Sequence, residues 1–223
     1  MHRIKLVFAV AFVVGASSTR LPAQGFDGII QFVSYEDGSK PDTMTQITKG
    51  SKIRFEGLGK EGGAMIMDGN TRLILVPDRK MYMNLPPELG SKVAADEMSK
   101  HRGVATKTGK VENIAGVPCE DWHYKGTDED GKPEEGDACL AKGVGFMINR
   151  LSGGMAGHFF SAGGQAFGDA LKNGAGVMKV IANGKLSLVA VKVQATSVPD
   201  AMFVPPAGYT KMSMPSMGRP PHE

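Results

Sequence analysis

The chain has 223 residues, with 26 lysine and arginine side chains against 23 aspartates and glutamates, and two cysteines. This length is enough to bury the core of one domain, and no linker-like stretch divides it. If residues 1–23 are removed, three basic groups leave with them and 26 − 3 = 23 basic groups face 23 acidic ones. We therefore expect no nucleic-acid partner, because a phosphate-binding surface needs clustered basic groups.

Residues 1–23 have the pattern of a secretory signal peptide. A short basic start precedes an apolar run over 6–14 that is too short to span a bilayer, and residues 21–23 (Leu-Pro-Ala) form a passable cleavage site. A cut after Ala16 fits the local sequence about as well. No cysteine follows the run, so a lipid anchor is not expected. We expect a soluble, exported protein of the periplasm or the extracellular space.

Cys119 and Cys139 are most simply a structural disulfide, because an exported chain passes through an oxidising compartment. The bridge would close a loop of roughly 20 residues and contribute about 3 kcal/mol by chain-entropy reasoning. Residues 127–137 within that loop are acidic and rich in turn formers, which predicts a solvated hairpin. A redox pair and two free thiols are the alternatives, and a redox pair more often has the close Cys-x-x-Cys spacing.

Turn dipeptides and short apolar runs indicate antiparallel sheet. The dipeptides that tolerate positive φ in tight hairpin turns are Asp37-Gly38, Asp68-Gly69, Asp130-Gly131 and Asn183-Gly184. The segment 52–56 alternates strictly, which predicts Ile53 and Phe55 on one face and three charged side chains on the other. Sequential hairpins of this kind predict one large, curved antiparallel sheet. The predicted strands cover residues 28–35, 52–56, 64–67, 72–76, 80–83, 121–124 and 186–193.

Two stretches break the strand pattern and are predicted to be helical. Residues 87–98 begin with a proline and fit a short surface helix that packs across the sheet. In 145–171 apolar residues recur every four positions, but each interior glycine costs about 1 kcal/mol relative to alanine, which predicts a broken helix. Three interpretations of this second stretch stay open. It closes the open face of the sheet, it is a lid over an apolar cavity, or it makes peripheral contact with envelope membranes.

Several short motifs carry a resemblance to a known family. They are Phe26-x-Gly28, Lys49-Gly50-x-Lys52-x-Arg54, Asp68 with Lys80-Met81-Tyr82-Met83, Gly109 with Ile114-Ala115-Gly116-x-x-Cys119, and Phe203-x-x-Pro206-Ala207-Gly208-Tyr209. Over nearly the whole mature chain this pattern resembles a bacterial exported family, the domain of unknown function DUF4412. Such proteins are distantly similar to the periplasmic carriers and outer-membrane receptors of lipoprotein localisation.

The resemblance implies an α+β, mainly β fold in a single domain over 24–210. Its curved antiparallel sheet would form an incomplete barrel, with helices covering the open face around a hydrophobic cavity. The glycine-rich stretch 145–171 departs from this pattern. The family brings no catalytic or binding residues that match positions of this chain.

The sequence lacks His-Glu-x-x-His, Gly-x-Ser-x-Gly and a P-loop. Asp121, His123 and Lys125 share one face of a predicted strand by simple alternation. That pattern favours a cross-strand polar pair over a catalytic one. We therefore expect a non-enzymatic protein with no catalytic residue and no cofactor.

Methionine is unusually frequent, with 14 in the chain. Residues 211–223 are predicted to form a flexible tail rich in methionine and proline. Thioethers are soft ligands, so this tail is a candidate site for Cu(I), and the alternative is a disordered tail without metal. The candidate ligands are Met212, Met214, Met217 and His222.

Three functions remain open on this evidence. The favoured one is a half-barrel whose concave face binds a lipid-like or other hydrophobic ligand, with roughly 0.8 kcal/mol from each buried methylene. The second is a structural or protein-interaction module of the cell envelope with a filled core and no ligand, and the third is a copper-binding protein that uses the tail. The residues expected to line the concave face are Ile53, Phe55, Leu73, Leu75, Met81 and Met83.

Overall fold

The computed structural model of the chain describes residues 26–35, 38–58, 61–86, 103–127, 132–144, 167, 170–171 and 173–212. The predicted signal peptide, the predicted helix over 87–98 and the tail beyond residue 212 lie outside these residues, as does most of 145–171. The division of the chain into signal, domain and tail therefore stays a prediction.

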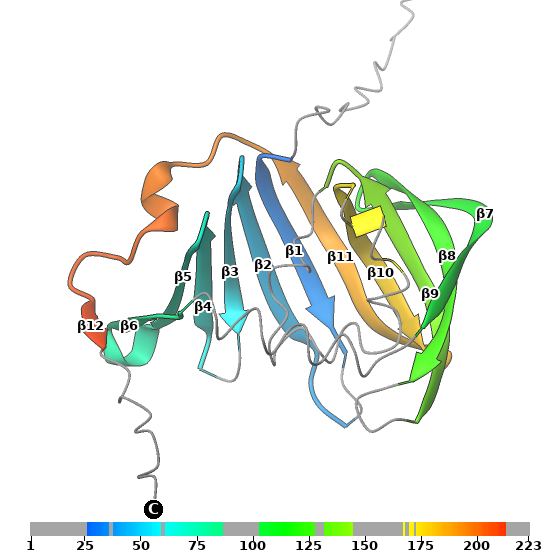
Figure 1. The fold of residues 1–223 in the computed structure, drawn as a ribbon, viewed down its shortest axis with the longest axis horizontal. Helices are drawn as coiled ribbons and strands as arrows, with labels where there is room; N and C mark the ends of the chain where they lie inside the picture. The colour runs from blue at the N-terminus through cyan, green and yellow to red at the C-terminus, as the bar shows by residue number, and fades with distance from the viewer. Residues whose placement is uncertain are drawn as a thin grey trace, which may run out of the picture.

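The described residues have a mainly β fold built on one sheet (Figure 1). The sheet has twelve strands. The strands are β1 (Gly28–Ser34), β2 (Asp42–Lys49), β3 (Lys52–Leu58), β4 (Gly63–Asp68), β5 (Thr71–Val76), β6 (Met81–Asn84), β7 (Val104–Ile114), β8 (Val117–Thr127), β9 (Pro133–Lys142), β10 (Ala175–Ala182), β11 (Lys185–Ala195) and β12 (Thr210–Met212). Their order in the sheet is β12-β6-β5-β4-β3-β2-β1-β11-β10-β9-β8-β7. The pairing is antiparallel except that β12 lies parallel to β6, so the predicted antiparallel sheet is in fact mixed.

Two-residue turns join several of these strands. Asn183 and Gly184 connect β10 to β11 with φ values of 49° and 77°, as their sequence predicts. Ala115 and Gly116 connect β7 to β8 with φ values of 51° and 83°. An alanine in this conformation is uncommon, so the residue types at this turn do not predict a hairpin.

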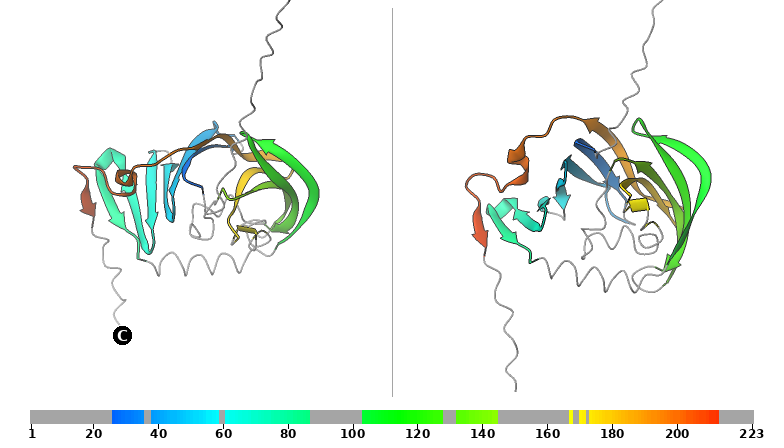
Figure 2. Two further views of the ribbon diagram at one scale, coloured as in Figure 1. Left: turned by 90° about the horizontal axis from the view of Figure 1, so that it is seen from above. Right: turned by 45° about the horizontal axis from the view of Figure 1, so that its top comes forward.

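The sheet curves strongly without closing, and β12 and β7 are its two edges (Figure 2). Register shifts interrupt the β7–β8 pairing between Lys107 and Val111 and the β9–β10 pairing between Val177 and Lys179. Such irregularities bend a strand and increase its local twist. The predicted curved, incomplete sheet is confirmed, whereas the helices expected over its open face lie almost wholly outside the described residues.

The sheet has apolar side chains on both faces. We call the face that carries Ile30, Phe32, Ile53 and Phe55 the inner face; its residues pack in one cluster with Phe167. The opposite, outer face of β2 to β5 is covered by segment 196–209, which contains the 3-10 helix η2 (Asp200–Phe203). The members of this outer cluster are Ile47, Ala64, Ile66, Leu73, Leu75, Val198 and Phe203.

Helices are short in the part of the chain that the structure describes. Besides η2, a 3-10 helix η1 (Pro77–Arg79) precedes β6, and Leu171 N–H donates to Phe167 C=O at 3.0 Å in a single helical turn. None of the helices in these ranges is long and apolar enough to cross a membrane.

Candidate functional site

The inner face carries a row of apolar side chains across β3 to β6. Register places Phe55 beside Met65, Met65 beside Ile74, and Ile74 beside Met83. Ile53 and Phe55 are 1% and 0% exposed, whereas Ile74 and Met83 are only half-buried. The row is therefore deeply buried in the middle of the sheet and accessible toward the β6 edge.

Methionine side chains are concentrated on this face. Residues that are paired across neighbouring strands point to the same side of the sheet, so the register places these methionines on the inner face. Methionine adapts to irregular apolar shapes because it is unbranched and flexible. On β2, β4, β6 and β12 the inner-face methionines are Met44, Met65, Met67, Met81, Met83 and Met212.

The six residues expected to line the concave face do not all share one side. Ile53, Phe55, Met81 and Met83 lie on the inner face. Leu73 and Leu75 pair with Ile66 and Ala64 and point to the outer face, where they pack in the cluster that contains Phe203. The single-face expectation is corrected for these two leucines, since adjacent residues of a strand point to opposite faces.

Aromatic side chains form the other end of the inner face. The ring of Phe167 lies edge-on to Trp122 and Tyr124, with centroid distances of 6.0 Å and 5.7 Å. Tyr124 Oη donates to Glu134 Oε1 at 2.9 Å, and burial, followed by the nearby Glu134 carboxylate, raises the pKa of Tyr124. The hydroxyl therefore stays protonated, and its donated hydrogen bond holds the ring against Phe167.

The predicted disulfide between Cys119 and Cys139 is formed, with an S–S distance of 1.98 Å. It joins β8 to β9 and is almost fully buried, the two residues being 2% and 0% exposed. This agrees with the expectation of an oxidising compartment, although residues 1–23 lie outside the described chain.

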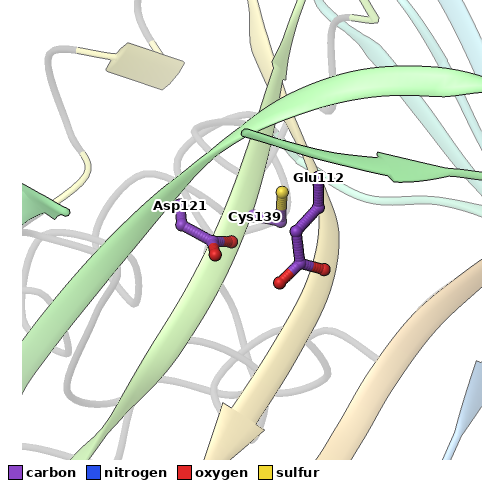
Figure 3. Close-up of side chains that lie close together, drawn as sticks. All are labelled: Glu112, Asp121 and Cys139. Atoms are coloured by element: carbon purple, nitrogen blue, oxygen red, sulfur yellow. The ribbon is translucent and has the colours of Figure 1, made fainter. Parts of the chain in front are cut away.

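A cluster of charged groups lies beside this disulfide, and no local sequence pattern predicts it. The side chains of Glu112, Asp121 and Cys139 lie close together (Figure 3). One ligand atom from each lies within 4.8 Å of the other two. Glu112 is paired in register with Cys119, and Lys179 with Cys139. Lys179 Nζ donates to Glu112 Oε2, so an ion pair from β7 to β10 spans the two strands that the disulfide joins.

The pKa values of the two carboxyl groups of the cluster are shifted in opposite directions. Burial, reinforced by a hydrogen bond with the Glu112 carboxylate, raises the pKa of Asp121. The hydrogen bond from Lys179 lowers the pKa of Glu112. Asp121 is 8% exposed, and its Oδ1 has no hydrogen-bond partner among the described residues. As the pH falls, Asp121 is therefore protonated before Glu112.

The donor set of this cluster does not suit a metal ion. The sulfur of Cys139 is committed to the disulfide, and Glu112 is already neutralised by Lys179. Only the Asp121 carboxyl is left as a ligand. Its pKa is raised, which disfavours the ionised form that a metal ion requires. We assign the cluster a structural role.

His123 takes part in the cross-strand polar pair that the sequence predicts for it. Its Nδ1 lies 2.9 Å from Asp137 Oδ1 on β9, and the next pair along the strands joins Lys125 to Glu135 at 3.0 Å. Both pairs are substantially exposed, and nothing in this arrangement indicates catalysis.

The family assignment follows from comparison with known proteins. The model for the domain of unknown function DUF4412 matches residues 26–209. The chain belongs to the DUF4412 family. Its match begins just before β1 and ends just before β12, so it includes both faces of the sheet and the disulfide.

Curated proteins and solved structures add little to this family assignment. No curated protein matches this DUF4412 protein in sequence. Among solved structures it is similar to an uncharacterised conserved protein from Thermus thermophilus, at 8% identity, with 85% of this chain and 91% of the other covered and a TM-score of 0.46. No argument about function rests on that likeness.

Proposed function

We propose that this DUF4412 protein is an exported, non-enzymatic protein that binds a lipid-like or other hydrophobic molecule against the inner face of its sheet. The observation that carries the proposal is the register of β3 to β6, which aligns apolar side chains on one side of an unclosed sheet. An acyl chain lying on these rows would gain roughly 0.8 kcal/mol for each methylene that leaves water.

The half-buried residues mark where such a molecule would bind. Met44, Leu58 and Ile74 pack against the inner cluster without being fully covered, and Met83 continues the row toward the edge strand. This side of the site contributes flexible and branched apolar groups, which suits a ligand of variable shape. The resemblance of the family to lipoprotein carriers, argued from sequence motifs, supports the same class of ligand.

The test is native mass spectrometry of the mature protein purified from a bacterial periplasm without detergent, followed by solvent extraction. We expect a reproducible adduct whose extracted component is a lipid. A bare mass from several preparations, together with no binding of a fluorescent fatty acid, would overturn the proposal.

A matched pair of variants locates the ligand. Met44 and Thr43 are neighbours on β2 that point to the inner and outer faces, and neither is fully buried. Met44→Asp places a charge on the proposed site and should abolish the adduct, whereas Thr43→Asp should keep it. Equal retention by two folded variants would place the ligand elsewhere.

A filled core is the second candidate. Ile30, Phe32 and Phe55 are 0%, 1% and 0% exposed, which favours a protein-interaction module whose inner face is occupied by its own chain. This candidate predicts the bare mass in the same experiment and the same thermal stability before and after delipidation.

A further inference from the structure

We propose that Met81, Met83 and Met212 form a site for a soft monovalent metal ion, Cu(I) or Ag(I), at the edge where β12 joins β6. β12 lies parallel to β6, and register pairs Met212 directly with Met83. Met81 lies two residues before Met83 on the same strand and therefore on the same face. Three thioethers from distant parts of the sequence are thus neighbours on the inner face.

The surroundings of the three methionines match this ion class. All three are half-buried, so their sulfurs are held by the sheet without being sealed from solutes. Their inner-face neighbours on β5 are Ile74 and Val76, which are apolar, and Thr210 on β12, paired with Met81, brings a single hydroxyl. Thioether ligands in apolar surroundings select Cu(I) over hard cations such as Mg²⁺ or Ca²⁺.

The site is built from the folded sheet and differs from the tail site considered from the sequence. It shares Met212 with that hypothesis and replaces the other proposed ligands with residues of β6. It shares Met83 with the proposed hydrophobic site, whereas Met212 is not among the residues assigned to that site. Exchange of methionine for leucine removes a thioether while preserving apolar volume. A loss of metal binding in Met212→Leu with an unchanged lipid adduct therefore separates the two proposals.

The experiment titrates the full mature chain with Ag(I), a redox-inert ion, and with Cu(I) under anaerobic conditions against a chromophoric Cu(I) chelator. We expect one ion per chain. We expect Met83→Leu and Met212→Leu each to weaken metal binding by at least about tenfold. Even the substitution of a residue that only supports a metal ligand has an effect of that size. Met67→Leu, on the same face but on β4, should bind as the wild type does.

A second readout identifies the ligands directly. In protein labelled with ¹³C at methionine methyl groups, Ag(I) should shift the resonances of Met81, Met83 and Met212 and leave those of Met65 and Met67 in place. The combined variant Met214→Leu, Met217→Leu and His222→Ala should keep binding if the site lies at β6 and β12. Loss of the ion in this variant, or retention in Met83→Leu, would overturn the proposal.

Discussion

Lys179 and Glu112 form an ion pair across the Cys119–Cys139 disulfide, each extending from the strand next to one of the cysteines. The Lys179 side chain is only 15% exposed, so the ion pair is partly shielded from solvent. Four consecutive strands, β10, β9, β8 and β7, are thus linked by one covalent bond and one ion pair in addition to their backbone ladders. This part of the sheet should be the last to open.

Removing the carboxylate should destabilise the protein. Glu112→Gln leaves the Lys179 ammonium largely buried without an ionic partner, and we expect a loss of roughly 1 to 3 kcal/mol in the free energy of unfolding. Urea denaturation at neutral pH measures the change. Glu135→Gln is the control, because the Lys125–Glu135 pair is well exposed to solvent and its loss should not be measurable. Equal effects of the two substitutions would contradict the assigned role of Glu112.

Asp121 should reduce stability at neutral pH. The pKa of Asp121 is raised in the folded state, so ionisation of this carboxyl destabilises the folded protein. This loss of stability is complete above the folded pKa and disappears as the pH falls. Asp121→Asn mimics the protonated form, and we expect it to raise the free energy of unfolding by about 1 to 3 kcal/mol at neutral pH. The advantage should shrink as the pH approaches the ordinary range of carboxyl groups. Thermal unfolding between mildly acidic and neutral pH tests this, and a constant difference would contradict it.

Glu112 should give the opposite pH dependence. Its pKa is lowered by Lys179, so its stabilising effect is complete above the unfolded-state pKa and is lost as the pH falls through the folded value. The deficit of Glu112→Gln relative to the wild type should therefore be largest at neutral pH and disappear in acid. A deficit that persists in strong acid would show that the substitution acts by packing.

The disulfide should contribute to stability through the unfolded chain. Replacing both cysteines by alanine is expected to lower the free energy of unfolding by about 3 kcal/mol, since the cysteines are 20 residues apart in sequence. Reducing agent should lower the urea midpoint of the wild type and have no effect on the double variant. A double variant as stable as the oxidised wild type would contradict this prediction.

Phe203 should hold segment 196–209 on the outer face. It is 4% exposed in the cluster with Leu73 and Leu75, so Phe203→Ala should cost about 3 to 5 kcal/mol. Hydrogen exchange should then increase in β12, which follows this segment along the chain. Asp200→Ala is the matched control. Asp200 pairs with Lys49 and Lys52 at 2.8 Å and 3.1 Å but is exposed to solvent, so its removal should leave stability unchanged.

Local sequence patterns determine several elements of this protein. The strict alternation of 52–56 predicts the buried pair Ile53 and Phe55, and Asn183-Gly184 predicts the turn between β10 and β11. The two cysteines, in a chain predicted to be exported, predict the disulfide. The alternation and the turn depend on side-chain period and on tolerance of positive φ, which are properties of neighbouring residues. The disulfide depends on the redox compartment expected for the chain. The mainly β architecture follows from the same patterns.

Tertiary structure decides the features that depend on distant strands. Residues 64–67 are buried on both faces, so no alternation indicates which side of β4 or β5 is inner. Leu73 and Leu75 are recognised as outer-face residues only because they pack with Phe203, which is distant in sequence. Strands β2, β7, β9, β10 and β12 have weak local patterns, and their pairing is fixed by long-range contacts.

The cluster of Glu112, Asp121 and Lys179, and the pairing of Met212 with Met83, arise in the same way. Residues far apart in sequence become neighbours only when strands pair. The free energy of that pairing belongs to the whole sheet, so no short stretch of the chain reveals it.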